Sequence, residues 1–159
     1  TTQQYISLTK DYIEFLIQKT NSKKAPGIDC ITNGMLKEIK KLVSKFLAKL
    51  FEKCLKVGYF PKQWKKGILT IFPKPNKPDL YNSKNYRPIT LLSSLGKLLE
   101  KIIQINIQNY LIETKKLNSN QHGFVPEKST ITALFEIKKR ILDDKIDRLT
   151  SILAIDFTG

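Results

Sequence analysis

The stretch LTIFPKPNKPDLYNSKNYRPITLL, residues 69–92, predicts the local structure around which the rest of the chain is organised. It contains two short apolar runs rich in β-forming residues, 68–72 and 89–92, and each run lies next to a proline. The connection between them is polar and rich in Pro, Asn, Lys and Asp, which favour turns. The pattern therefore predicts two paired strands joined by a basic turn.

Two cations lie near the inner ends of these runs, Lys74 after the first and Arg87 before the second. Paired strands could direct both side chains at one anion. Arg87 could grip a phosphate with two parallel hydrogen bonds, and Lys74 could add a point charge. The alternative interpretation of this stretch is an ordinary hairpin with solvated charges.

Composition indicates a folded, strongly basic protein. The chain has 159 residues, enough for one domain or a piece of a larger one, and 41% of them are apolar, so it can form a core. Its 28 Lys and Arg against 14 Asp and Glu give a net charge of +14, which favours an anionic partner, nucleic acid first. A genome that favours Lys codons would produce part of this excess without any function. Positive charge is concentrated at 62–101, with nine cations against two acids, as a phosphate-binding face requires.

Several classes of protein are disfavoured. Two cysteines, Cys30 and Cys54, are too few and too far apart for a zinc site or a disulfide framework, and Cys54 is expected to be buried. No apolar run approaches the length of a membrane span, and nothing resembles a secretory signal. The chain begins without Met and stops after an apolar run, so we expect a fragment at both ends.

Apolar periodicity predicts four helices, at 8–20, about 34–57, about 95–112 and from Ser129 or Thr130, one of which caps the helix, to about 142. The first is expected to bury Leu8, Tyr12, Phe15 and Leu16 on one face. The second has the strongest pattern, and its expected core stripe is Met35, Ile39, Leu42, Val43, Phe46, Leu50, Cys54 and Val57. The third is expected to bury mostly Leu98, Leu99, Ile102, Ile103, Ile105 and Tyr110.

Three further features remain. Trp64, the only tryptophan, lies among lysines and could stack on a base, but covering the edge of the core is the favoured interpretation. His122, the only histidine, is expected to be a loop residue without an acid–base role. A final strand is predicted at 151–157, and neither a repeat nor a linker marks a second domain.

Seven short motifs in order resemble one family. They are APGID at 25–29, FPKP at 72–75, NYRPITLL at 85–92, KLLEKII at 97–103, QHGF at 121–124, KST at 128–130 and AIDF at 154–157. Together they resemble the reverse transcriptase domain of non-LTR, LINE- or jockey-like retrotransposons, from the fingers to the start of the palm. The resemblance covers about residues 23–159. A group II intron maturase-like polymerase shares the chemistry, but the NYRPITLL and QHGF motifs fit the non-LTR type better.

The resemblance implies an RNA-directed DNA polymerase, in which a primer 3′-hydroxyl attacks the α-phosphate of a dNTP. Asp156 matches the first catalytic carboxylate, and with the carbonyl of Phe157 it would bind Mg²⁺ in a two-metal site. Without the family, Asp156 is only an acid at a strand end. The later carboxylates, and the residue that excludes ribonucleotides, are expected beyond Gly159, so the isolated piece is expected to be inactive.

Other positions carry over residue by residue. Lys74 and Arg87 match residues that contact the incoming triphosphate, and Phe157 belongs to the same dNTP site. Contacts with the RNA template or DNA primer are expected from Gln121, Gly123, Phe124, Lys65 and Lys66. Val125 departs from the family pattern, because many relatives carry Arg there, and one phosphate contact is therefore missing.

The expected fold is α+β: a mostly helical fingers subdomain with a basic hairpin, and fingers–palm helices, over 1–150, then the first palm strand at 151–159. The rest of the palm and the thumb would be the partner of this piece, and the parent element is expected to act in the nucleus. The rival hypothesis is a decayed or co-opted fragment that only binds RNA or DNA through its basic face. Such a fragment would tolerate Asp156→Asn but would bind less tightly as salt rises.

Overall fold

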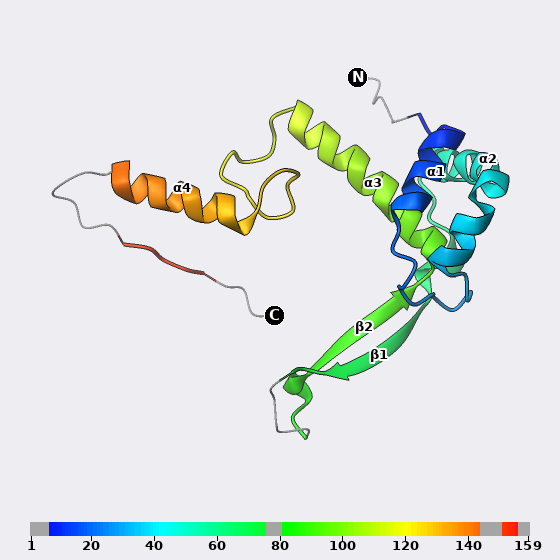
Figure 1. The fold of residues 1–159 in the computed structure, drawn as a ribbon, viewed down its shortest axis with the longest axis horizontal. Coiled ribbons are helices and arrows are strands. Elements are labelled where there is room, and N and C mark those ends of the chain that lie inside the picture. Colours follow the sequence, from blue (N-terminus) through cyan, green and yellow to red (C-terminus); the bar gives the residue numbers. More distant parts are fainter. Residues whose placement is uncertain (1–6, 76–80, 144–150, 156–159) are drawn as a thin grey trace. The chain divides into compact units, whose positions relative to one another are not determined.

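The computed structural model describes residues 7–75, 81–143 and 151–155, and it shows a mixed helix and strand fold (Figure 1). In chain order the elements are α1 (Lys10–Lys19), α2 (Asn33–Val57), the 3-10 turn η1 (Lys62–Lys65), β1 (Gly67–Pro73), the 3-10 turn η2 (Ser83–Asn85), β2 (Tyr86–Leu92), α3 (Ser94–Glu113) and α4 (Thr130–Asp143). The four predicted helices and the predicted strand pair are confirmed. The chain divides into two compact units, 1–110 and 111–159, which the sequence did not indicate.

Side-chain caps explain where the first helices begin. Thr9 precedes α1 and accepts a hydrogen bond from the N–H of Tyr12, and Thr32 precedes α2 and accepts one from Met35. Each threonine thus satisfies an N–H group that has no partner inside the helix. Helix α2 ends at Gly58, whose φ of 64° lies in the left-handed region that glycine adopts without strain.

The core of the first unit is formed by α1, α2 and the first half of α3. Its buried hydrophobic members are Ile13, Leu16, Ile17, Leu36, Leu47, Ala48, Phe51, Cys54, Leu98, Leu99 and Ile102. Burial raises the pKa of the Cys54 thiol above its ordinary value, so this cysteine stays protonated at neutral pH. The predicted burial of Cys54 is confirmed.

The predicted core stripe of α2 is largely wrong. Helix α2 is apolar on two sides, and periodicity alone could not show which side is packed. The buried side includes Ser44, fully buried, whose hydroxyl donates a hydrogen bond to Glu14 Oε1 at 3.0 Å. Small residues such as Ser44 and Ala48 let α1 and α2 approach closely, and the larger stripe is left exposed, namely Met35, Ile39, Leu42, Phe46 and Val57.

Smaller corrections apply to α1 and α3. In α1, Phe15 is 54% exposed, whereas Ile13 and Ile17 are buried, because the helix is rotated from the predicted face. In α3, Leu98, Leu99 and Ile102 are buried as predicted, but Tyr110 is exposed because it lies beyond the part of α3 that contacts the core.

Trp64 covers the edge of this core, as the favoured interpretation predicted. Its ring meets Phe51 edge-on, with ring centroids 5.9 Å apart, and Phe60 in the same manner at 6.1 Å. A Cβ on Gly96 would lie 3.1 Å from the Cβ of Trp64, so glycine lets α3 pass close to the indole.

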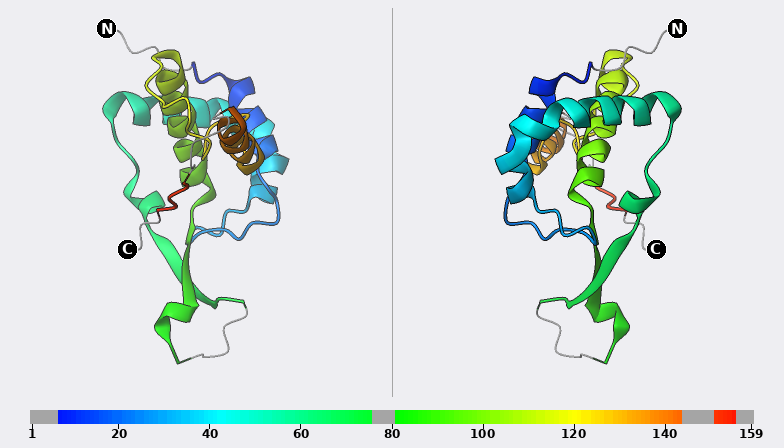
Figure 2. Two further views of the ribbon diagram at one scale, coloured as in Figure 1. Left: turned by 90° about the vertical axis from the view of Figure 1, so that its left-hand side faces the viewer. Right: turned by 90° about the vertical axis from the view of Figure 1, so that its right-hand side faces the viewer.

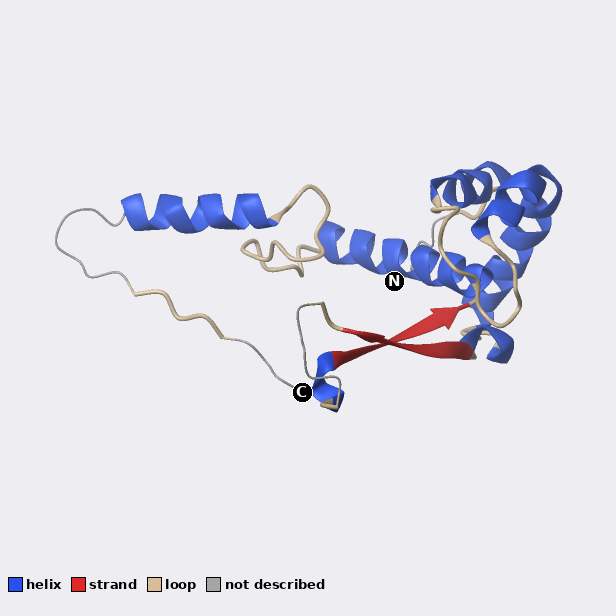
Figure 3. Cartoon of the chain, turned by 60° about the horizontal axis from the view of Figure 1, so that its bottom comes forward, coloured by secondary structure: helices blue, strands red, loops and turns tan. Residues whose placement is uncertain are grey.

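Strands β1 and β2 form a two-stranded antiparallel hairpin, drawn in red in Figure 3 and seen from two sides in Figure 2. The register pairs Gly67 with Leu92 at one end and Pro73 with Tyr86 at the other. Alternate residues of a strand point to opposite faces. The hairpin therefore has one face with Ile71, Tyr86 and Pro88 and another with Phe72 and Arg87.

The loop at 25–31 fixes the junction between β2 and α3. Ser93 donates a hydrogen bond to Asp29 Oδ2 at 2.6 Å, and Ser94 donates one to the carbonyl of Ile31 at 2.8 Å. A Cβ on Gly27 would lie 2.5 Å from the backbone N of Ser93. Only glycine therefore permits this loop to lie against the backbone at that point.

The second unit has local order but no buried side chain among its described residues. Ser129 caps α4 as predicted: its Oγ accepts from the N–H of Thr132 at 3.3 Å, and Thr132 Oγ1 accepts from the N–H of Ser129 at 2.8 Å. Residues 151–155 form no strand, in contrast to the prediction, since no partner strand lies beside them in the described chain. Ile152, Leu153 and Ile155 are exposed there.

No helix in the described part of the chain combines the length and the apolar character needed to span a membrane.

Candidate functional site

The strongest candidate site is the cationic face at the turn end of the hairpin, where β1 and β2 are connected. Arg87 lies opposite Phe72 in the register, and the N–H of Lys74, one residue beyond β1, donates to the carbonyl of Asn85 at 2.7 Å. This bond continues the pairing by one step, so Lys74 and Arg87 are diagonal neighbours on one face. Such neighbours lie about 7–8 Å apart, within reach of long side chains. The strand pair is confirmed, and its register is compatible with both side chains reaching one anion; their joint role in binding that anion stays a prediction.

The side chain of Lys74 also orders the turn. Its Nζ donates to the carbonyl of Lys84 at 2.7 Å, which links the end of β1 to η2. A second hydrogen bond orders the same turn, because Asn82 Oδ1 accepts from the N–H of Lys84 at 3.0 Å. The Lys74 ammonium is half-buried and Arg87 is exposed. Within the described part of the chain, neither Lys74 nor Arg87 forms an ion pair with a carboxylate.

Lys65 and Lys66 are exposed and lie at the opposite end of β1, at η1 and directly after it. The seven residues of β1 separate them from Lys74. Seven residues of strand span about 23 Å at 3.3 Å per residue. Lys65 and Lys66 therefore could contact phosphates of a strand that runs along the hairpin, but they do not share the anion site of Lys74 and Arg87.

Gln121, Gly123 and Phe124 lie together in the loop between α3 and α4, in the second unit. Gln121 Nε2 donates to the carbonyl of Gly123 at 3.3 Å, a bond that holds the loop closed on itself. Phe124 adopts a positive φ of 60° and is 96% exposed. A non-glycine residue in the left-handed region whose ring faces solvent is consistent with a contact residue. Its role with template or primer stays a prediction.

His122 has a structural environment. Its Nδ1 lies 2.8 Å from Thr132 Oγ1, the same hydroxyl that takes part in the cap of α4. Arg140 NH2 donates to Asn120 Oδ1 at 2.7 Å and Lys128 Nζ donates to the carbonyl of Ser119. The His122 and Arg140 bonds tie the loop to α4. The expectation that His122 has no acid–base role stays a prediction.

Asp156 and Phe157 lie outside the described residues, and the predicted metal site is therefore not tested by the geometry. Within residues 7–75, 81–143 and 151–155, no group of three or more His, Cys, Asp or Glu is placed to hold a metal ion. The assignment of Mg²⁺ to Asp156 and Phe157 stays a prediction.

Two features were not predicted from the sequence. The APGID motif supported the resemblance, but its packing of Gly27 and Asp29 on Ser93 depends on contacts across more than sixty positions. The second is a pocket on the other face of the hairpin, beside Tyr81 and Tyr86. Two tyrosines flanking a basic turn were its only sequence signal.

The chain is similar to polymerases of mobile elements over most of its length. It is 39% identical over 126 residues, 77% of the chain, to the probable RNA-directed DNA polymerase from transposon BS of Drosophila melanogaster. It is 33% identical over 129 residues to the probable RNA-directed DNA polymerase from transposon X-element of the same species. It is 36% identical over 118 residues to the RNA-directed DNA polymerase from mobile element jockey, also of Drosophila melanogaster.

No protein-family model matches the chain. The matched region is 13–14% of the length of these three curated relatives, which are much longer proteins. The similarity nevertheless covers 74–81% of this chain. The resemblance inferred from the motifs is thus confirmed: the chain belongs to the reverse transcriptase family of non-LTR retrotransposons, as a stretch homologous to part of these longer proteins.

Proposed function

We propose that this chain is the fingers part, with the start of the palm, of an RNA-directed DNA polymerase, and that its hairpin binds the triphosphate of the incoming dNTP. The observation that carries the proposal is the register of β1 and β2, which puts Lys74 and Arg87 on one face at the turn end of the hairpin. The relatives named as RNA-directed DNA polymerases support the reaction class.

Each cation has a separate task in this proposal. The Arg87 guanidinium is planar and fits two phosphate oxygens at once, so it orients the triphosphate. Lys74 adds positive charge, and its backbone is fixed by the bond to Asn85. Charge grows on the leaving pyrophosphate as the α-phosphate is attacked, and preorganised cations stabilise it.

The metal belongs to the same proposal. Asp156 and the carbonyl of Phe157 would hold Mg²⁺, because small, hard cations prefer carboxylate, carbonyl and phosphate oxygens. When bound, Mg²⁺ supplies activation of the primer hydroxyl and neutralisation of the triphosphate. The remaining carboxylate ligands would come from the longer protein.

The proposal also assigns the subdomains and partners. Residues 1–150 would form the fingers and the fingers–palm helices, and residues 151–159 would contribute the first palm strand. Exposed apolar residues at 151–155 support this, because such a strand would be covered by palm strands supplied from outside this stretch. Template RNA and primer DNA would contact Gln121, Gly123, Phe124, Lys65 and Lys66, and the parent protein would act in the nucleus.

The test is primer extension by the polymerase that contains this chain. Arg87→Ala should lower kcat/KM for dNTP by about 10- to 100-fold, since a charged hydrogen bond to phosphate contributes about 1.5–3 kcal/mol. Asp156→Asn should abolish extension while RNA binding persists. The matched control is Lys53→Ala, which removes an exposed cation from α2 outside the hairpin. It should change neither kcat/KM for dNTP nor RNA binding. Extension that survives Asp156→Asn would contradict the catalytic assignment.

A binding-only role is the second candidate, favoured by the net charge of +14. It predicts a different pattern in the same experiment. Lys74→Ala and Arg87→Ala would weaken RNA or DNA binding and reduce its salt dependence. Asp156→Asn would have no effect, and no variant or condition would give extension.

A further inference from the structure

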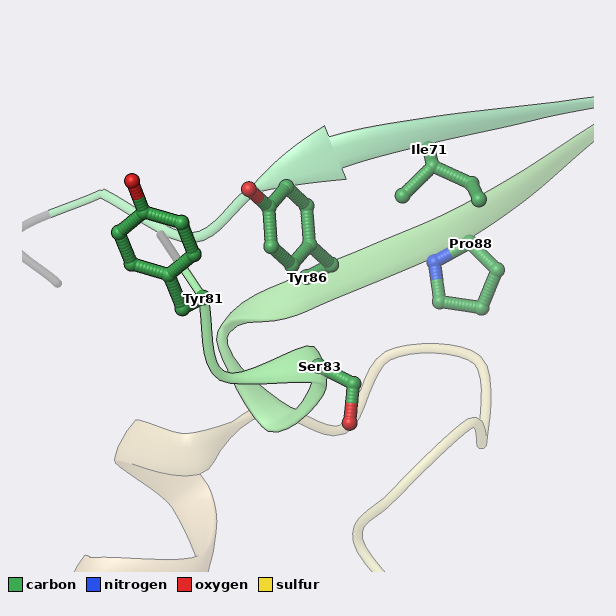
Figure 4. A pocket seen from close by; sticks show the side chains of 5 residues that line it. All are labelled: Ile71, Tyr81, Ser83, Tyr86 and Pro88. Atoms are coloured by element: carbon green, nitrogen blue, oxygen red, sulfur yellow. The ribbon is translucent and has the colours of Figure 1, made fainter. Parts of the chain in front are cut away.

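The hairpin carries a pocket on the face opposite Arg87. It has a volume of about 520 Å³ and is lined by Ile71, Tyr81, Ser83, Tyr86 and Pro88 (Figure 4). The register pairs Ile71 with Pro88 and Pro73 with Tyr86, which puts Ile71, Tyr86 and Pro88 on one face. Arg87 points to the other face because it alternates with its neighbours along the strand. The pocket is therefore separate from the proposed triphosphate site.

The lining is suited to a flat, partly polar ligand. Ile71 and Pro88 provide an apolar floor, and the two tyrosine rings lie at its side, as Figure 4 shows. The Tyr81 side chain is fully exposed at 101%. A solvent-exposed aromatic ring beside the apolar side chains of Ile71 and Pro88 offers a surface on which another ring can stack. Ser83 adds a hydroxyl that can donate to or accept from a ligand edge.

The turn that carries these groups is fixed before any ligand arrives. Asn82 caps η2 through the N–H of Lys84, and Lys74 Nζ holds the carbonyl of Lys84 from β1. Asn85 adds a backbone bond to Asn82, from its N–H to the Asn82 carbonyl at 2.9 Å. A preorganised turn binds with a smaller loss of conformational entropy than a loose one.

Charge identifies the ligand class. Lys84 is exposed and follows Ser83 in η2, so the turn that lines the pocket also carries a positive charge. A single-stranded nucleic acid has both complementary parts, a ring for the tyrosines and a phosphate for the lysine. An acidic peptide would satisfy the lysine, but its acidic side chains offer no ring that could stack on a tyrosine.

We propose that this pocket binds an unpaired base of single-stranded RNA, with Tyr81 and Tyr86 stacking on the base and Lys84 contacting a neighbouring phosphate. The choice of RNA over DNA rests on the proposed function, whereas the base site rests on the pocket alone. It is a separate site for the template strand on the face opposite the triphosphate.

The test measures fluorescence anisotropy of two labelled ten-nucleotide RNAs with the 159-residue chain at fixed salt. One RNA is oligouridylate, and the other has abasic sites in place of its bases but the same phosphates. Tyr81→Ala should raise the Kd for oligouridylate by about 5- to 100-fold, the range for loss of base stacking. It should leave the Kd for the abasic RNA unchanged. Tyr81→Phe, which keeps the ring, should bind like the unaltered chain.

Two further variants separate stacking from charge and from general damage. Lys84→Ala should weaken the binding of both RNAs. It should also lower the slope of log Kd against log salt by about 0.7, the value for one phosphate contact on a single strand. Tyr59→Ala, which removes a half-exposed tyrosine outside the pocket, should change neither Kd. Because Tyr81 is fully exposed, its substitution should leave the circular dichroism spectrum unchanged.

Several outcomes would overturn the proposal. If Tyr81→Ala raised the Kd equally for both RNAs, or raised the Kd for neither, a base site would be excluded. Competition by oligoglutamate as effective as that by oligouridylate would favour an acidic protein partner instead. Tighter binding of oligothymidylate than of oligouridylate would overturn the assignment to RNA. No step uses dNTP or primer extension, so failure of the polymerase proposal would be seen separately.

Discussion

The two units differ in what holds them together. The first, residues 1–110, has a core in which Phe51, Ile17 and Ile102 are fully buried. The second, residues 111–159, has a capped amphipathic helix whose large apolar side chains are exposed, for example Ile131 at 76% and Phe135 at 66%. Helix α4 therefore depends on local bonds, whereas α1, α2 and α3 depend on one another.

The chain contains a natural probe for each unit. Trp64, its only tryptophan, packs on Phe51 in the first unit, and His122, its only histidine, contacts Thr132 in the second. Tryptophan fluorescence and the histidine NMR signals can therefore follow the two units separately. These two signals, together with circular dichroism of the whole chain, can test whether the units are as different as their burial indicates.

The largest difference is expected between two phenylalanines. Phe51→Ala should lower the free energy of unfolding by about 3–5 kcal/mol, because it leaves a cavity in the core. Phe135→Ala should change it by less than about 0.5 kcal/mol, because the side chain is exposed. Urea unfolding followed by circular dichroism would measure both values. Equal effects would mean that α4 packs on a core in solution, and the comparison between the units would fail.

A smaller difference is expected between two glycines. Gly27→Ala should lower the free energy of unfolding by about 2 kcal/mol, because the new methyl group meets the backbone of Ser93 and Leu92. Gly123→Ala is the matched control, since a Cβ there meets nothing within 4 Å. Thermal unfolding of both variants, monitored by Trp64, would measure the effect. An unchanged midpoint for Gly27→Ala would show that the loop at 25–31 does not clamp β2 to α3.

The smallest effects are expected at the two helix caps. Thr32→Ala and Ser129→Ala each remove one side-chain acceptor and should weaken their helices by about 1 kcal/mol. Only Thr32→Ala should shift the Trp64 unfolding midpoint, because α2 is part of the core. Ser129→Ala should instead alter the His122 signals and speed hydrogen exchange in α4. If Ser129→Ala shifts the Trp64 midpoint as much as Thr32→Ala does, the two units unfold together.

Much of the candidate site was predictable because it depends on short-range patterns. The hairpin required two β-forming runs and a turn, and the position of Lys74 and Arg87 near its inner ends followed from their places beside those runs. The Ser129 cap required only the spacing to Thr132. The clamp of Gly27 and Asp29 on Ser93 could not be predicted in this way, because it joins segments far apart in the chain.

The sequence by itself determined the positions of the helices, the strand pair, the basic character and the family. Each of these depends on local propensity, on the order of motifs or on composition, which the chain carries residue by residue. The tertiary structure alone decided which side of α2 is buried, since both sides are apolar and only packing in the core with α1 and α3 selects the one with Ser44 and Ala48. It also decided that Tyr81 and Tyr86 share a pocket on the face opposite Arg87, because the strand register puts neighbouring residues on opposite faces of the hairpin.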